Sequence, residues 1–179
     1  MATADMLRPY VEQKVAEYLG IEKVAVDDDG DIPIKAGSAV CYARLFDSSN
    51  GPIFRAFAPL LLDVPKSEAL LERLNELNGI AHFVRYFWQA EQVFCSVDLP
   101  AEDLQPGEIQ LALLAVSVGA DEYDDELKTA FGGRRMIEGE PKPEGSAPGK
   151  GGTAASGLDA AGPDPNPGPE TGTADTAYL

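Results

Sequence analysis

The segment HFVRYFWQ, residues 82–89, gathers residue types that serve in many active sites. It contains the chain's only histidine, His82, its only tryptophan, Trp88, and also Arg85. A histidine works as a general base only with suitable groups within hydrogen-bond reach. The sequence has no G-x-S-x-G, P-loop or G-x-G-x-x-G motif. Because no spacing assembles a nucleophile, a base and oxyanion donors, we predict no catalytic residue and no enzymatic activity.

Two acidic clusters resemble metal sites on first inspection. In DDDGD, residues 27–31, the EF-hand pattern would place ligands at Ala25 and Ala36, which have no side-chain oxygen. The cluster therefore predicts a tight turn between strands. In DEYDDE, residues 121–126, carboxylates recur along one predicted helix, which is typical of a solvated helix face. We predict neither a metal site nor a cofactor.

Composition restricts the classes of partner. The 179 residues include 30 acidic and 14 basic residues, a formal net charge of −16. That charge repels phosphate groups, so neither nucleic acid nor an anionic membrane is an expected partner. Cys41 and Cys95 lie outside any C-x-x-C pattern, which favours buried free thiols in a reducing compartment. With no apolar leader and no run of membrane-spanning length, a soluble cytoplasmic protein is expected.

The composition changes abruptly near Gly132. Residues 139–179 hold nine glycines and seven prolines among 41 residues, and almost no large apolar side chain. Such a segment buries too little surface to offset its ordering entropy. We therefore predict a folded domain at residues 1–135 and a disordered Gly/Pro-rich tail at residues 136–179.

Within the predicted domain, the hydrophobic pattern alternates between helical and strand periodicity. Apolar residues at spacings of three and four predict helices, with Asn78-Gly79 as the C-cap of the second one. Leu111, Leu114 and Val118 widen the apolar face of the last helix, so its first half is expected to be buried on two sides. The predicted helices are 4–19, 66–77 and 108–131, and the predicted strands are 24–26, 32–34, 39–46, 53–64, 81–88 and 92–99.

This order of elements predicts an α+β fold. Two main hairpins would form an antiparallel sheet, with helices before, between and after them. The helices would pack mainly on one face of the sheet, and the other face would stay partly open.

The second hairpin defines which side chains share a face. If Ala90 and Glu91 form its turn, Trp88, Tyr86 and Val84 lie opposite Val93, Cys95 and Val97, and this apolar set should face the helices. The alternate set includes Arg85 and Asp98, which would be costly in a dry core. A slip of one residue would mix the two sets, so the register is well specified.

The first hairpin repeats this alternation, and the open face therefore collects arginines among aromatic rings. We interpret this set as a partner-binding surface for a protein or peptide segment. The guanidinium groups would favour an acidic segment. A sheet-packing or homodimer face, with arginine stems over apolar rings, explains the same pattern. The predicted binding residues are Tyr42, Arg44, Phe46, Arg55, Phe57, Phe83, Arg85, Phe87 and Phe94.

The block from LLLDVPKSEALLERLNELNG through AHFVRYFWQAEQVFCSVDL to the last helix resembles a known superfamily. It is similar to the type III secretion chaperone-like proteins, including YbjN-type domains and their actinobacterial relatives. The match covers about residues 4–132 and consists of a strand, a Leu-rich helix closed by Asn-Gly, an aromatic hairpin and a long closing helix. The resemblance implies a non-enzymatic, often dimeric module that binds extended peptide segments. It transfers no individual site residue, because it rests on packing positions.

Overall fold

The described residues, 2–36 and 39–136, form three helices and five strands in this computed structural model. The predicted tail lies outside the described residues from position 137 onward. The elements in chain order are α1 (Ala4–Leu19), β1 (Ile32–Ala36), β2 (Ala39–Ser48), β3 (Gly51–Leu61), α2 (Glu68–Ile80), β4 (Arg85–Gln89), β5 (Gln92–Pro100) and α3 (Pro106–Phe131).

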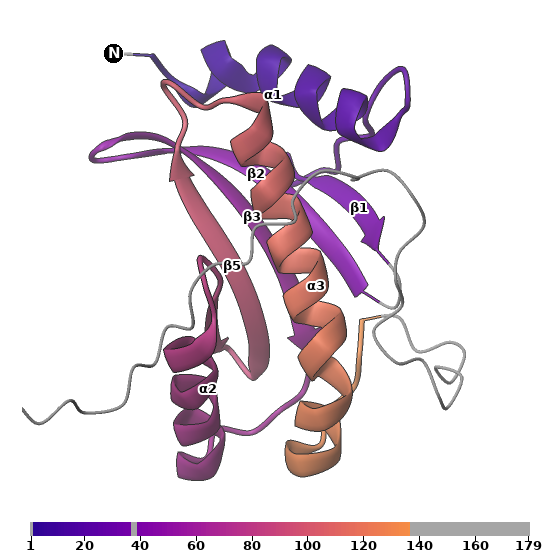
Figure 1. Cartoon of the computed structure of the whole chain (residues 1–179), viewed down its shortest axis with the longest axis vertical. Helices are drawn as coiled ribbons and strands as arrows, with labels where there is room; N and C mark the ends of the chain where they lie inside the picture. Colours follow the sequence, from indigo (N-terminus) through magenta and orange to yellow (C-terminus); the bar gives the residue numbers. More distant parts are fainter. Residues whose placement is uncertain (1, 37–38, 137–179) are drawn as a thin grey trace, which may run out of the picture. The chain divides into compact units, whose positions relative to one another are not determined.

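The strands form one antiparallel sheet in the order β1-β2-β3-β5-β4. Helix α3 lies across β2, β3 and β5, α1 runs over one end of α3, and α2 lies next to β4 (Figure 1). The predicted α+β fold, with helices before, between and after the hairpins, is confirmed.

The β4–β5 hairpin has the predicted register. Gln89 pairs with Gln92 across a turn at Ala90 and Glu91, and Phe87 pairs with Phe94. Both turn residues have positive φ, 49° and 60°, as a type I′ turn requires. The register therefore follows from a tight turn together with strict alternation of side chains.

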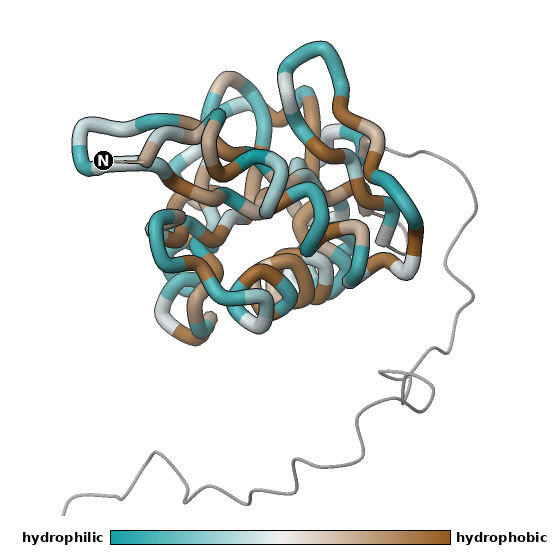
Figure 2. The backbone as a smooth tube through the Cα atoms, turned by 90° about the horizontal axis from the view of Figure 1, so that it is seen from above, coloured by the Kyte–Doolittle hydropathy of each residue, from teal (hydrophilic) through white to brown (hydrophobic). Residues whose placement is uncertain are grey.

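One face of this sheet and the inner side of α3 form the core. Val93, Cys95 and Val97 of β5 are buried together with Tyr86 of β4. Ile109, Leu113, Val116, Ala120 and Leu127 of α3 are buried opposite them. In the view of Figure 2, the peripheral loops are mostly hydrophilic, whereas hydrophobic stretches run along the packed elements. Both cysteines are buried free thiols, as predicted.

Three sequence predictions about local structure are wrong, and the first two concern residues 24–26 and the first half of α3. Residues 24–26 form no strand, because the chain from Gly20 to Asp31 is a loop that ends in a turn where Asp27 bonds the backbone of Asp31. The first half of α3 is buried on one side only. Its second apolar side is exposed, because no other described element packs against it.

Asn78 and Gly79 do not cap α2, which continues to Ile80. Instead, the Asn78 amide bridges α2 and β4. Its Oδ1 accepts a hydrogen bond from the backbone N–H of Tyr86 (2.7 Å), and its Nδ2 donates to the carbonyl of Tyr86 (2.9 Å). These two bonds occupy the place that a further strand would take, so α2 shields the outer edge of the sheet.

Asn78→Ala should therefore lower the free energy of unfolding by about 1 kcal/mol, because it removes the hydrogen-bond partners of the backbone N–H and carbonyl of Tyr86. Asn75→Ala makes the same change at an exposed position of the same helix and should have little effect. Urea unfolding of the two variants provides the comparison. Equal stability of both would show that water replaces the Asn78 amide without cost.

Candidate partner-binding surface

The second face of the sheet carries the aromatic and arginine residues that the sequence predicted. No helix of the described chain packs on it, and its side chains are half-buried by one another. Eight of the nine predicted residues lie there, and we call these eight the open face. They are Tyr42, Arg44 and Phe46 of β2, Arg55 and Phe57 of β3, Arg85 and Phe87 of β4, and Phe94 of β5.

Strand pairing places these side chains in rows across the sheet. Tyr42 pairs with Phe57, Phe57 with Ser96, and Ser96 with Arg85, so one row crosses four strands. In the adjacent row Arg44 pairs with Arg55, and Arg55 with Asp98. Two arginines directly opposite each other would repel unless carboxylates compensate them.

The carboxylates that compensate the arginines are Asp31 and Asp98. Arg44 donates from Nε to Asp31 at 2.6 Å, and Arg55 donates from Nε to Asp98 at 2.6 Å. Asp98 also accepts from Arg85 Nη2 at 2.7 Å. The hydrogen bonds to Asp31 raise the pKa of Arg44 above its ordinary value. The three guanidinium groups are therefore held by direct ion pairs to two carboxylates, and Asp27 and Asp29 lie near enough to act on Arg44 as well.

The rings and guanidinium groups are also layered on one another. Tyr42 stacks on Phe57 with ring centroids 5.2 Å apart, and Phe87 stacks on Phe94 at 5.5 Å. The guanidinium carbon of each arginine lies over an aromatic ring. Its distance to the ring centroid is 5.1 Å for Arg44 over Phe57, 4.9 Å for Arg55 over Phe46 and 5.4 Å for Arg85 over Phe87. Such stacking holds the side chains in fixed positions and reduces the entropy that they lose on binding.

A shallow hollow lies in the middle of the open face. It has a volume of about 210 Å³ and is lined by Arg44, Arg55, Phe57, Phe87, Gln89 and Phe94. Its walls therefore offer apolar rings and hydrogen-bond donors side by side. Such a hollow fits one side chain of a bound polypeptide better than a whole small-molecule ligand, whose pockets are usually larger.

Phe83, the ninth predicted residue, is not on the open face. It precedes β4 and has a φ of 67°, and a hydrogen bond from Val84 N–H to the His82 carbonyl closes a tight turn around it. This turn interrupts the alternation of side chains, so Phe83 borders a pocket on the helix side with Val97 and Leu111. Strand periodicity alone predicted the wrong side.

Sequence reasoning missed two residues at the margin of the open face. Asp31 lies just before β1 and bonds Arg44 of β2. The sequence could have indicated this contact only through the pairing of β1 with β2. The second is Met136, whose sulfur lies 3.7 Å from the Tyr42 hydroxyl. Arg134 exchanges two backbone hydrogen bonds with Leu62, and this pairing brings the chain back to the sheet after α3.

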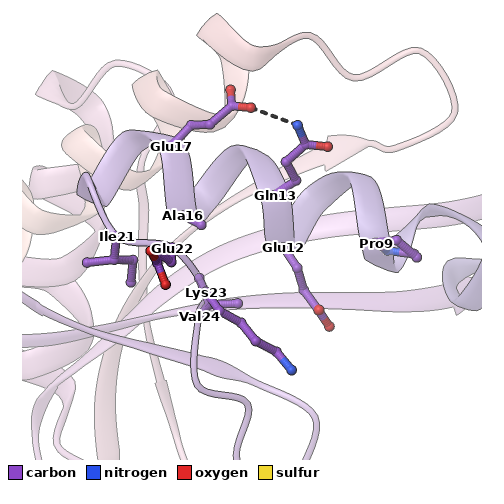
Figure 3. A pocket seen from close by; sticks show the side chains of 9 residues that line it. All are labelled: Pro9, Glu12, Gln13, Ala16, Glu17, Ile21, Glu22, Lys23 and Val24. Carbon is purple, nitrogen blue, oxygen red and sulfur yellow. Dashed lines mark hydrogen bonds between the residues drawn. The ribbon is translucent and has the colours of Figure 1, made fainter.

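A larger hollow of about 420 Å³ lies between α1 and the loop that follows it. Figure 3 shows its side chains: Glu17 bonds Gln13 and points away from Glu12, which extends toward the opposite side. The acidic groups therefore do not converge on one point, as the polar groups of a catalytic or metal site would. In the described part of the chain, no group of three or more His, Cys, Asp and Glu residues has metal-binding geometry.

No helix within the described ranges has the length and apolar character needed to cross a membrane. A search of curated proteins finds no match. Among solved structures, a chain of the ExsC–ExsE complex has a TM-score of 0.53 at 14% identity, covering 70% of this chain and 96% of that one. A chain of the HopA1–SchA chaperone–effector complex has a TM-score of 0.50 at 13% identity, covering 70% and 99%. These likenesses show a shared fold.

The family assignment rests on the sequence itself. The model of the family described as T3SS (YopN, CesT) and YbjN peptide-binding chaperone 1 matches residues 5–139. This range contains every helix and strand of the sheet domain except the first residue of α1. It agrees with the resemblance found in the element order. The chain therefore belongs to the family of T3SS and YbjN peptide-binding chaperones.

Proposed function

We propose that the protein is a non-enzymatic, chaperone-like adaptor that binds an extended segment of a partner protein on the open face. The family description supports peptide binding in general. Solved structures of similar fold include a chaperone–effector complex. Where on this chain such a segment binds is part of our proposal, and the features of the open face support it.

The observation that carries the proposal is an ordered layer of aromatic rings and guanidinium groups on a strongly acidic protein. Aromatic and arginine side chains most often dominate binding energy in protein interfaces. A face with no function would more cheaply be covered with small polar residues, as on many antiparallel sheets.

The chemistry of the face favours a partner segment that carries carboxylates beside apolar residues. Each arginine makes its hydrogen bonds through Nε and Nη2. The Nη1 group of each is thus the donor that a bound carboxylate or carbonyl would use. An apolar side chain of the segment would enter the hollow between Phe57 and Phe87.

The alternative is a homodimer in which the open face is used for self-association. Two copies placed face to face would bring arginines against arginines, and Asp31 and Asp98 of each copy are already bonded to arginines of their own chain. The stacking geometry favours this arrangement no more than the binding of a peptide. Sedimentation velocity distinguishes the two, because a dimer through this face would dissociate on Arg55→Glu substitution.

A photo-crosslinking experiment tests the proposal. Peptide ligands are first selected from a phage-displayed random library on the full chain. p-Benzoylphenylalanine then replaces Phe87 on the open face or Leu71 on the exposed side of α2. We expect the selected peptide to crosslink at position 87 and not at position 71. Crosslinking at position 71 alone, or equally at both positions, would contradict the proposal.

A further inference from the structure

A row of exposed apolar side chains runs along the outer side of α3. Leu111, Leu114 and Val118 are 47%, 52% and 54% exposed, at spacings of three and four residues along one side of the helix. We call these three residues the α3 ridge. The opposite side of α3 packs on the sheet through Leu113 and Val116, so the ridge and the open face lie on opposite sides of the sheet.

One end of the ridge borders a small apolar pocket. The pocket has a volume of about 120 Å³ and is lined by Phe83, Val97, Leu99, Glu108, Leu111 and Ala112. Phe83 stands at its margin and is 74% exposed. The turn before β4 places this ring next to Leu111, which makes the apolar surface continuous from the sheet to the helix.

The residues that flank the ridge along α3 and β5 are acidic, and in the described part of the chain Arg73 and Arg135 bond carboxylates of α3 near its C-terminal end. Residues 86–127, which include β5 and nearly all of α3, contain ten aspartates and glutamates and no lysine or arginine. Glu108 lines the pocket, and Glu122 is exposed one helical turn beyond Val118. An apolar row framed by carboxylates is complementary to a helix with apolar residues on one side and lysines or arginines beside them.

We infer that the α3 ridge is a second docking surface, for a basic amphipathic helix of a partner protein. Apolar side chains of that helix contact Leu111, Leu114 and Val118, and one of them enters the pocket beside Phe83. Its lysines or arginines lie near Glu108 and Glu122. This inference goes beyond the binding of a segment to the open face, since it concerns the other side of the molecule and a partner of opposite charge.

Charge also argues against a second copy of this chain as the occupant. Antiparallel packing of two ridges around Leu114 would bring Glu108 of one copy toward Glu122 of the other. With no lysine or arginine in residues 86–127, nothing on α3 or β5 before Lys128 would compensate these carboxylates. A basic partner removes the repulsion and adds attraction that steers association.

The test measures binding of a fluorescent model helix to the full chain by fluorescence anisotropy. The probe is a peptide of leucines and lysines with all leucines on one side, and its control has glutamates in place of the lysines. The ridge variant is Leu114→Ser with Val118→Ser. The matched control variant is Leu71→Ser with Ile80→Ser, which makes the same kind of change at exposed apolar positions of α2.

We expect the leucine–lysine peptide to bind the wild-type chain and the glutamate peptide not to bind. The ridge variant should weaken binding about tenfold, because the loss of apolar contacts at the centre of an interface lowers the binding free energy. The α2 variant, and the open-face variant Arg85→Ala with Phe87→Ala, should bind as the wild type does. Glu122→Lys leaves the apolar row intact and should also weaken binding, which keeps the test valid if the ridge variant unfolds.

Two outcomes would overturn the inference. One is equal affinity of the peptide for the ridge variant and the α2 variant, which would show that net charge alone attracts it. The other is a wild-type dimer in sedimentation velocity that the ridge variant converts to monomer, which would make a second copy the occupant.

Discussion

Leu113→Ala is expected to lower the free energy of unfolding by about 2–5 kcal/mol, the range for truncating a buried leucine. Leu113 is 1% exposed and lies centrally on the inner side of α3, opposite the sheet. Alanine would leave a cavity between two rigid layers that cannot collapse completely. Urea unfolding gives the difference, and its midpoint should move without a large change in slope.

The neighbouring residue provides the control for this prediction. Leu114 is 52% exposed, so Leu114→Ala removes the same atoms from a position that α3 does not bury. Its effect should stay within about 0.5 kcal/mol, as for most surface substitutions. A smaller loss for Leu113→Ala than for Leu114→Ala would mean that α3 packs on the sheet through its other side.

The double substitution Arg85→Ala with Phe87→Ala is expected to weaken binding of a selected peptide ligand about 100-fold. Each residue belongs to a type that often contributes more than about 1 kcal/mol to an interface, and tenfold in affinity corresponds to 1.4 kcal/mol. Both line the same part of the open face, where the Arg85 guanidinium lies over the Phe87 ring. Titration calorimetry with the selected peptide provides the measurement.

The double variant should remain folded, because neither Arg85 nor Phe87 belongs to the buried core. The Arg85 side chain is 53% exposed, and exposed ion pairs contribute only about 0–1 kcal/mol. Leu71→Ala with Arg73→Ala removes an apolar residue and an arginine from α2 and serves as the matched control. Full affinity in the open-face variant, or an equal loss in the α2 variant, would be incompatible with binding at the open face.

The sheet and its faces could be predicted from sequence because two independent signals agree. The β4–β5 hairpin combines a two-residue turn with strict alternation of apolar and polar residues, and the register follows from both. Arg55 and Asp98 fell on the same predicted face, and they are paired in the structure. Alternation therefore identified most of the open face without any structural information.

The misassigned residues depend on features that periodicity does not encode. Phe83 changes side because of one residue with positive φ, which non-glycine residues rarely adopt. Leu111 and Val118 follow helical spacing, but spacing cannot tell whether a second layer covers them. Asn78 has the sequence environment of a helix cap, and its actual role depends on where Tyr86 lies in the fold.

The arrangement of charges on the open face could be predicted only in part. The sequence indicated three arginines on one face, and it also placed Asp98 there. It gave no reason to connect Arg44 with Asp31, since that contact depends on how the loop before β1 folds. The Arg44–Asp31 ion pair is therefore a result of tertiary structure.

The most direct test of the central claim is an NMR titration that follows the arginine Nε–Hε signals of the full chain with a selected peptide ligand. Arg44, Arg55 and Arg85 lie on the open face, whereas Arg73 lies on α2, where it bonds Glu126. Binding at the open face predicts saturable shifts of the first three signals and little change at Arg73. Saturable binding that leaves the signals of Arg44, Arg55 and Arg85 unchanged would contradict the proposed function.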